Sequence, residues 1–147
     1  MSVYGRFKKS KEGFRQLVEL LETTPASRRQ KMIDVGMKED ADYTLRALQY
    51  VMTFEDILKL GDMEIAELVV KAPARTIAMA ISPLDDIIKK RFLQNSKPPL
   101  MTEIRDYLAV KVGVTEVGGA QLKMVQCARE LEKAGKLQIK KIPPNLS

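Results

Sequence analysis

The sequence predicts a fold built only from α-helices, and three observations support this prediction. Apolar residues recur every three or four positions along most of the 147 residues, which is the spacing of one helix face. No segment shows the alternation of apolar and polar residues that marks a strand. Leu, Ile, Val, Met and Ala are plentiful, whereas Trp is absent and aromatic residues are only 5% of the chain. We therefore expect a compact, right-handed stack of about eight short helices.

The first third of the chain predicts three helices after a flexible lead-in. Residues 1–10 are polar and basic and lack helical periodicity, so we expect them to be flexible. Beyond them, Thr24 and Pro25 have the pattern of an N-cap followed by proline in the first turn, and Gly36 is a typical helix stop. The three helices are expected to begin near Lys11, Thr24 and Asp40.

The remaining helices are marked by capping residues, glycines and prolines. The clearest signal is Ser82-Pro83-Leu84-Asp85, which places serine at the N-cap, proline first and an acid third. Residues 141–147 contain Pro143-Pro144 and are expected to form a loose tail. Further starts are expected at Thr53, Asp62, Ser96 and Thr115, and further stops at Gly61, Asn95, Gly113 and Gly135.

The composition argues against enzymatic chemistry. The chain contains no histidine, which removes imidazole bases and most zinc sites, and a single cysteine, Cys127, which we interpret as a buried filler. Adjacent acids do not share a helix face, so Asp85-Asp86 and Glu55-Asp56 are interpreted as helix-start residues. Gly118-Gly119 lies in no phosphate-binding motif. We expect no catalytic residue, no metal and no cofactor.

The charge balance favours a solvated surface over a nucleic-acid interface. The 25 Lys and Arg and 19 Asp and Glu give a net charge of +6, with acids beside most bases. A nucleic-acid-binding role is therefore a minor alternative, supported only by this charge and by the clusters Arg28-Arg29 and Lys89-Lys90-Arg91. No 18-residue apolar run or signal-peptide pattern occurs, so we expect a cytoplasmic protein without membrane insertion.

One expected helix, over residues 97–111, combines charged and apolar faces. Leu100, Ile104 and Leu108 are spaced four apart on one side. The charged positions are Lys97, Glu103, Arg105, Asp106 and Lys111. The pattern fits either an ordinary solvated helix or a ridge that docks on a partner of complementary charge.

Several segments, taken in order, resemble the C-terminal part of the FliG family of bacterial flagellar motor switch proteins. The stretch over residues 51–58, followed by Gly61-Asp62 and Ile65, is similar to the family's Met-Phe-x-Phe motif and the segment after it. Similar stretches follow at residues 91–95, 104–108 and 121–137, so that the resemblance covers roughly residues 14–140.

The resemblance implies a fold, an organisation and partners. The fold would be an armadillo-like helical segment over residues 11–52 and a six-helix-type, FliG C-terminal-like domain over residues 53–140. The chain would be a non-enzymatic part of the flagellar rotor, acting in torque transmission or direction switching. Its partners would be a FliM-type ring protein bound in the 14–52 region, a MotA-type stator loop and other FliG copies, at the cytoplasmic face of the flagellar basal body.

The resemblance also assigns candidate sites. Lys97, Glu103, Arg105, Asp106 and Lys111 would face the stator, and Val51, Met52, Thr53 and Phe54 would form a hinge. The family's five charged ridge positions fall near Ser82, Pro99, Asp106, Tyr107 and residues 113–115, and among these Asp106 keeps its charge. In the hinge, Phe54 matches while Val51 and Met52 replace Met and Phe. An alternative is therefore a FliG-like adaptor that has lost the stator-facing charge pattern.

Overall fold

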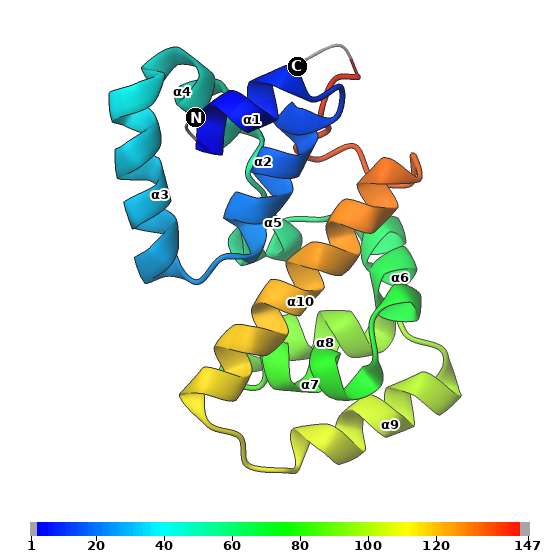
Figure 1. The fold of residues 1–147 in the computed structure, drawn as a ribbon. Coiled ribbons are helices and arrows are strands. Elements are labelled where there is room, and N and C mark those ends of the chain that lie inside the picture. The colour runs from blue at the N-terminus through cyan, green and yellow to red at the C-terminus, as the bar shows by residue number, and fades with distance from the viewer. Residues whose placement is uncertain (1–2, 145–147) are drawn as a thin grey trace. The chain divides into compact units, whose positions relative to one another are not determined.

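The computed structural model describes residues 3–144, and within this range every regular element is a helix (Figure 1). The all-helical prediction is confirmed, with ten helices in the described range instead of about eight. Their bounds are α1 Val3–Lys9, α2 Gly13–Thr23, α3 Ala26–Glu39, α4 Ala41–Tyr50, α5 Phe54–Leu58, α6 Asp62–Lys71, α7 Ala74–Ile81, α8 Asp86–Gln94, α9 Pro98–Leu108 and α10 Val114–Lys133. The chain divides into a first unit, Met1–Met52 with Lys140–Ser147, and a second unit, Thr53–Ile139.

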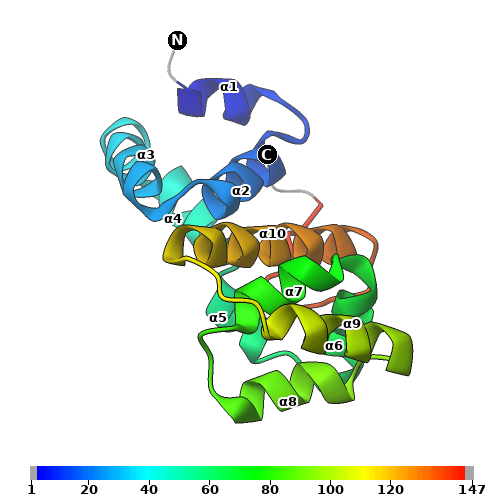
Figure 2. The ribbon, with the colours of Figure 1, turned by 90° about the horizontal axis from the view of Figure 1, so that it is seen from below.

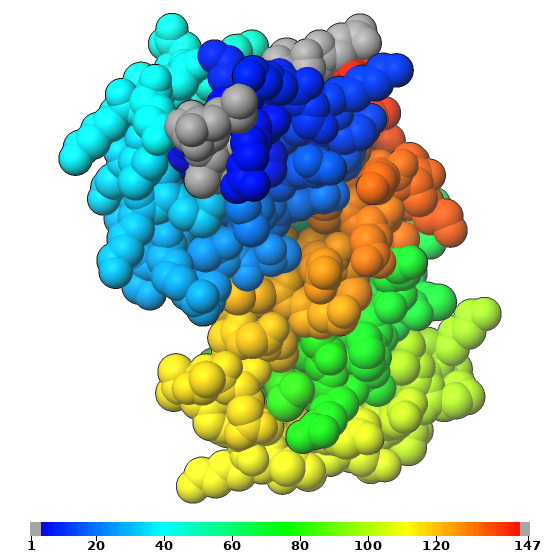
Figure 3. Space-filling model, in the orientation of Figure 1, coloured from blue at the N-terminus to red at the C-terminus, as the bar shows by residue number. Residues whose placement is uncertain are grey.

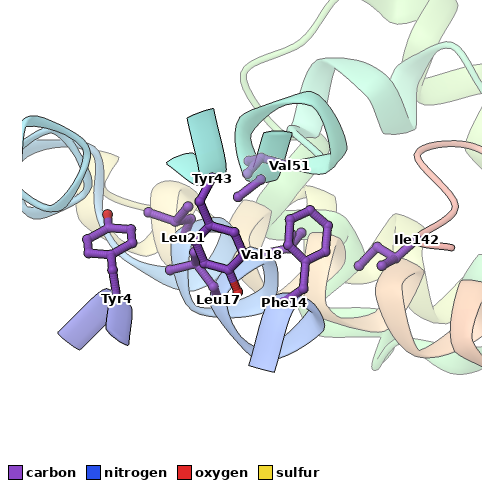
Figure 4. Packing of buried hydrophobic residues seen from close by; sticks show 9 residues of the cluster. Tyr4, Phe14, Leu17, Val18, Leu21, Tyr43, Val51 and Ile142 are labelled. Carbon is purple, nitrogen blue, oxygen red and sulfur yellow. The ribbon is translucent and has the colours of Figure 1, made fainter. Parts of the chain in front are cut away.

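The first unit is built around an aromatic and aliphatic core (Figure 4). The Phe14 ring lies 5.6 Å from that of Tyr43 and 5.8 Å from that of Tyr50, centroid to centroid. Leu17, Val18 and Leu21 share the buried face of α2, as the helical spacing predicts. Ile142 joins the same cluster and is 3% exposed, so the expected loose tail is anchored at this residue. Residues 145–147 of that tail lie outside the described part of the chain.

The expected flexible lead-in is instead a helix over its described residues. Helix α1 packs on α2, and Tyr4 is only 2% exposed. The Tyr4 hydroxyl donates to the backbone carbonyl of Met32, and Lys8 forms an ion pair with Asp40. These tertiary contacts explain how a seven-residue helix forms without a strong apolar repeat of its own.

Gly36 does not end the second predicted helix. Helix α3 continues to Glu39, and Gly36 is buried. A Cβ atom built on Gly36 would lie 2.5 Å from Cζ of Tyr4 and 2.5 Å from Oγ1 of Thr44. The glycine is therefore used for close approach between elements, not for a turn.

The second unit contains the six helices α5 to α10, as expected for the C-terminal lobe. Helix α7 packs against both α9 and α10 (Figure 2). Its buried side is Ala74, Ile77, Ala78, Ala80 and Ile81. Three alanines and two isoleucines make up this face, and the small alanines let two neighbouring helices approach the same element.

Helix boundaries in the second unit agree with the sequence at some caps and differ at others. Thr53 begins α5 with a reciprocal capping box to Asp56, and Gly135 follows α10 with a φ of 80°, both as predicted. Asp85, not Ser82, is the N-cap of α8, because its carboxylate accepts from the N–H of Ile88 at 3.1 Å.

Glycines replace the expected polar caps at two further helices. Gly61 precedes α6 in place of Asp62, and Gly113 precedes α10 in place of Thr115. In both cases a glutamate in the first turn, Glu64 or Glu116, accepts a hydrogen bond from the glycine N–H. The third-position glutamate thus supplies one half of a capping box, while the glycine has no side chain with which to accept from the first-turn N–H groups.

Candidate functional site

Helix α9 is the element that positions the charged residues singled out in the sequence. Pro98 and Pro99 occupy its first two positions, with Lys97 at the N-cap. The helix ends at Leu108, where Ala109 donates its N–H to the carbonyls of Asp106 and Tyr107. The prediction of a helix continuing to Lys111 is therefore too long, and Lys111 lies in the connector to α10.

The inner face of α9 is apolar, as the four-residue spacing predicts. Ile104 is 0% exposed, and Leu100 and Leu108 are half-buried. This face packs on α7 and α8. Because one row of side chains is held in this way, the rotation of α9 about its own axis is fixed, and so is the direction in which its other residues point.

The side chains of the five charged candidates are all exposed to solvent: Lys97, Glu103, Arg105, Asp106 and Lys111. At 3.6 residues per turn, Asp106 points almost opposite to Ile104, with Glu103 and Arg105 on either flank. Within the described residues none of the five forms an ion pair. Their side chains are therefore exposed to solvent and available to a partner.

The remaining family ridge positions carry no charge in the structure. Ser82 is half-buried at the end of α7, where its hydroxyl donates to the carbonyl of Met79 at 3.0 Å. Pro99 is exposed in the first turn of α9, and Tyr107 is 39% exposed near its end. Gly113 is exposed at the N-cap of α10.

The hinge candidates lie where the chain passes from the first unit to the second, between Met52 and Thr53. The N–H of Met52 donates to Oε2 of buried Glu22 at 2.7 Å. The next N–H, that of Thr53, donates to Oδ2 of Asp56 at 2.9 Å. The peptide group before Met52 is therefore bound by Glu22 of the first unit, and the peptide group after it is bound by Asp56 of the second unit. Only the φ and ψ angles of Met52 lie between these two planar groups. The side chains of Val51, Met52 and Phe54 are buried.

Two cavities beside α9 were not foreseen from the sequence. One, of about 450 Å³, is lined by Ser82, Pro83, Leu108, Val110, Lys111, Val112, Val114 and Val117. The other, of about 640 Å³, is lined by residues of α6 and by the turn from α8 into α9. The repeated valines over residues 110–117 were the signal for the first cavity, but their spacing alone does not show that they converge.

The described residues can be compared with the requirements of a metal site and of a reactive cysteine. Within residues 3–144 no three His, Cys, Asp or Glu side chains gather in a way that could hold a metal ion. Cys127 is 5% exposed, and burial raises the pKa of its thiol, so the reactive thiolate is disfavoured. Among the described helices, none combines the length and apolar character needed to cross a membrane.

Comparison with known proteins identifies the family. The FliG C-terminal domain profile matches residues 37–139. The flagellar motor switch protein FliG of Aquifex aeolicus is 31% identical over 130 residues, which are 87% of this chain and 40% of that protein. FliG of Thermotoga maritima is 26% identical over 129 residues, 86% of this chain and 38% of that protein.

Solved structures agree with the sequence matches. A crystal structure of FliG residues 86–343 from H. pylori has a TM-score of 0.62 at 20% identity, covering 85% of this chain and 60% of that one. Full-length FliG from Aquifex aeolicus has a TM-score of 0.56 at 27% identity, covering 86% of this chain and 40% of that one. The chain thus spans about two fifths of the length of the curated relatives it matches. It belongs to the FliG C-terminal domain family.

Proposed function

We propose that the chain is a non-enzymatic component of the flagellar motor switch that works through protein–protein contacts at the cytoplasmic face of the basal body. Family membership supports this, since the curated relatives are named flagellar motor switch proteins. The observation that carries the proposal is the solvated charged face of α9 on a helix locked by Ile104. The first unit would be the armadillo-like segment and the second the torque-transmitting domain.

The charged face of α9 would contact a MotA-type stator loop. Exposed ion pairs contribute only about 0.2–1 kcal/mol each, so a few of them give a contact that forms and releases easily. Complementary charge nevertheless speeds association and selects the partner. These are the properties required of a rotor surface that passes successive stators. Asp106 is central in this arrangement because it lies farthest from the buried row.

The first unit would dock a FliM-type ring protein and further copies of FliG-like chains. Exposed large apolar side chains on this unit are Leu20, Val35, Met37 and Leu45, between 39% and 48% exposed. Large apolar side chains that gather at a surface are typical of protein interfaces, and these four are the candidates on this unit. They belong to α2, α3 and α4, and they would be the candidate contacts in the 14–52 region.

Direction switching would use the joint at residues 51–54. The two peptide planes on either side of Met52 are each tied to their own unit, so rotation between units would be concentrated in the torsion angles of this residue. Val51, Met52, Thr53 and Phe54 would together form the hinge. The buried side chains of three of them would limit this rotation to discrete positions.

The stator contact is tested by Asp106→Lys in a strain that carries the chain as its native protein. Asp106 is exposed and unpaired within the described residues, so thermal stability should change by less than about 0.5 kcal/mol. The variant should swim less well than the unchanged strain. In a binding assay at low salt, it should bind a purified MotA-type cytoplasmic loop more weakly than the unchanged chain does. Glu67→Lys, which makes the same charge change on the exposed side of α6 and also removes the exposed ion pair between Glu67 and Lys136, is the control and should swim normally. Normal swimming of the Asp106 variant would contradict the proposal.

A further inference from the structure

The cavity at the C-terminal end of α9 has the properties of a docking site for one apolar side chain. We infer that it receives a leucine-sized side chain, adjacent in sequence to a carboxylate, from the protein that contacts α9. This inference deepens the function proposed above and rests on it for the identity of the partner. It names a contact that the charged face alone does not provide.

The cavity is apolar and its valines are unusually accessible. Val114 is 90% exposed and Val110 is 57% exposed, and Leu108, Val112, Val117 and Pro83 complete the apolar lining. In Figure 3 the yellow segment that contains residues 110–117 lies at the surface of the molecule. At about 450 Å³ the cavity is about three times the volume of the ~150 Å³ protein cavities that bind benzene. It can therefore accommodate a large aliphatic side chain with room for part of its backbone.

The valines are held in this arrangement by backbone hydrogen bonds. Before the connector, the N–H of Val110 donates to the carbonyl of Tyr107 at 3.0 Å. After it, the N–H of Gly113 donates to Oε1 of Glu116 at 3.4 Å, and the N–H of Val117 donates to the carbonyl of Gly113 at 3.0 Å. The connector is thus fixed at both ends by the helices that it joins. A site that is already formed loses less entropy when a partner binds.

The charge of the lining selects the partner chemistry. Lys111 is the one charged residue that lines the cavity, and it has no ion pair within the described residues. The Ser82 hydroxyl already donates to the carbonyl of Met79. The inserted apolar side chain would fill the valine-lined space, and a carboxylate next to it in sequence would reach Lys111. The contact would then have a desolvated apolar centre and a polar rim, as protein interfaces commonly do. An acidic, leucine-containing segment fits these features, and a basic segment does not.

The cavity between α6 and α9 fits such a segment less well, although it is larger. One wall is polar and consists of Gln94, Asn95, Ser96 and Lys97, so a lysine lines this cavity as well. The two cavities differ in their other polar groups, because the first has only Ser82 beside its lysine and apolar residues. The amide of Asn95 is already engaged, since it donates to Oδ1 of Asp62 at 3.2 Å. This second cavity therefore serves as an internal comparison in the test.

The test uses a short alanine-rich helical peptide with one Leu-Glu pair, titrated into the ¹⁵N-labelled full chain and followed by NMR. Amide shifts should appear at residues 108–117 and near Pro83. Replacing Leu by Ser or Glu by Lys in the peptide should abolish them. Val114→Asp should weaken binding about tenfold, equivalent to about 1.4 kcal/mol, and Lys111→Glu should also weaken it. Shifts confined to the α6 cavity, or binding unchanged in Val114→Asp, would overturn the inference.

The matched control is Ile87→Asp. Val114 is the first residue of α10 and Ile87 the second of α8, and both are more than 80% exposed. An acid in either first turn suits the helix dipole, so both variants should fold normally. Ile87→Asp should bind the peptide as the unchanged chain does.

Swimming assays separate this inference from the proposed function. If Asp106→Lys stops swimming while Val114→Asp changes neither swimming nor peptide binding, the docking inference fails and the stator contact stands. If Asp106→Lys swims normally while peptide binding still requires Val114 and Lys111, the stator contact fails and the docking site stands.

Discussion

Replacing Gly36 by alanine should destabilise the protein, although alanine is the better helix former. Gly36 lies within α3, three residues before its end, and an alanine in a helix is ordinarily favoured over glycine by about 0.5–1 kcal/mol. Here the added methyl group would lie 2.5 Å from Cζ of Tyr4 and 2.5 Å from Oγ1 of Thr44. Ordinary carbon contacts are about 3.5–4.0 Å, so the overlap is about 1 Å with each neighbour.

Neither neighbour can move away at low cost. Thr44 is 0% exposed, and its hydroxyl donates to the carbonyl of Asp40 at 2.8 Å. Tyr4 is 2% exposed and is tied by its hydroxyl to the carbonyl of Met32. Overpacking of this kind costs about 1–3 kcal/mol. Subtracting the helix-propensity gain of about 0.5–1 kcal/mol leaves a net loss centred near 1 kcal/mol and at most about 2.5 kcal/mol.

Urea and thermal unfolding of Gly36→Ala and Gly118→Ala provide the measurement and its control. Gly118 also lies within a helix, but a Cβ atom built there meets no atom within 4 Å. Gly118→Ala should therefore stabilise the chain by about 0.4–1 kcal/mol, the opposite sign. Each kcal/mol should shift the melting temperature by about 2–4 °C in a chain of this length. If Gly36→Ala proved as stable as the unchanged protein, the close approach of Tyr4 and Thr44 to Gly36 would be refuted.

Two further changes test the first unit. Ile142→Ala removes a side chain that is 3% exposed in the aromatic core and should lower the free energy of unfolding by about 2–4 kcal/mol; a loss below 0.5 kcal/mol by urea unfolding would show that the tail is not docked. Asp40→Asn should reduce the loss of unfolding free energy that the protein shows as the pH is lowered. The hydrogen bond from Lys8, followed by that from the Tyr43 N–H, lowers the pKa of Asp40, so its contribution is present above the ordinary aspartate pKa and is lost as the pH falls through the lowered value. Identical pH profiles of the two proteins in thermal unfolding would contradict this.

The sequence predicts the helical fold and the inner face of α9 because both depend on local periodicity. Ile104, with Leu100 and Leu108 one turn away on either side, forms an apolar row along one face of the helix. Burial of this row determines which face of α9 packs against the rest of the unit. The exposure of Asp106 follows from the same row, since it lies on the opposite side of the helix. Thr53 is equally local, because its partner Asp56 is three residues away.

The sequence does not predict features that depend on distant contacts. Ser82 and Asp85 are both suitable N-cap residues for α8. Asp85 occupies this position because α7 continues to Ile81 and Ser82 is the C-cap of α7. Helix α1 is stabilised by Tyr4 and Lys8 through partners 28 and 32 residues away, which no periodicity within residues 1–10 reveals. The valine-lined cavity likewise needs α7, α9 and α10 to meet before its lining exists.

The limits of the family match do not coincide with the limits of a stable fragment. The match begins at residue 37, inside α3, and ends at residue 139, before the segment that carries Ile142. The core of the first unit is nevertheless made largely by residues outside the match, namely Phe14, Leu17, Val18, Leu21 and Ile142. Within the match, α4 contributes Tyr43 and Ala47, which are buried only because those outer residues cover them. A fragment cut at residues 37 and 139 would expose this face of α4 and would lose Glu22, which holds the N–H of Met52. The joint between the units therefore depends on residues outside the matched range 37–139, and tests of switching require the whole chain.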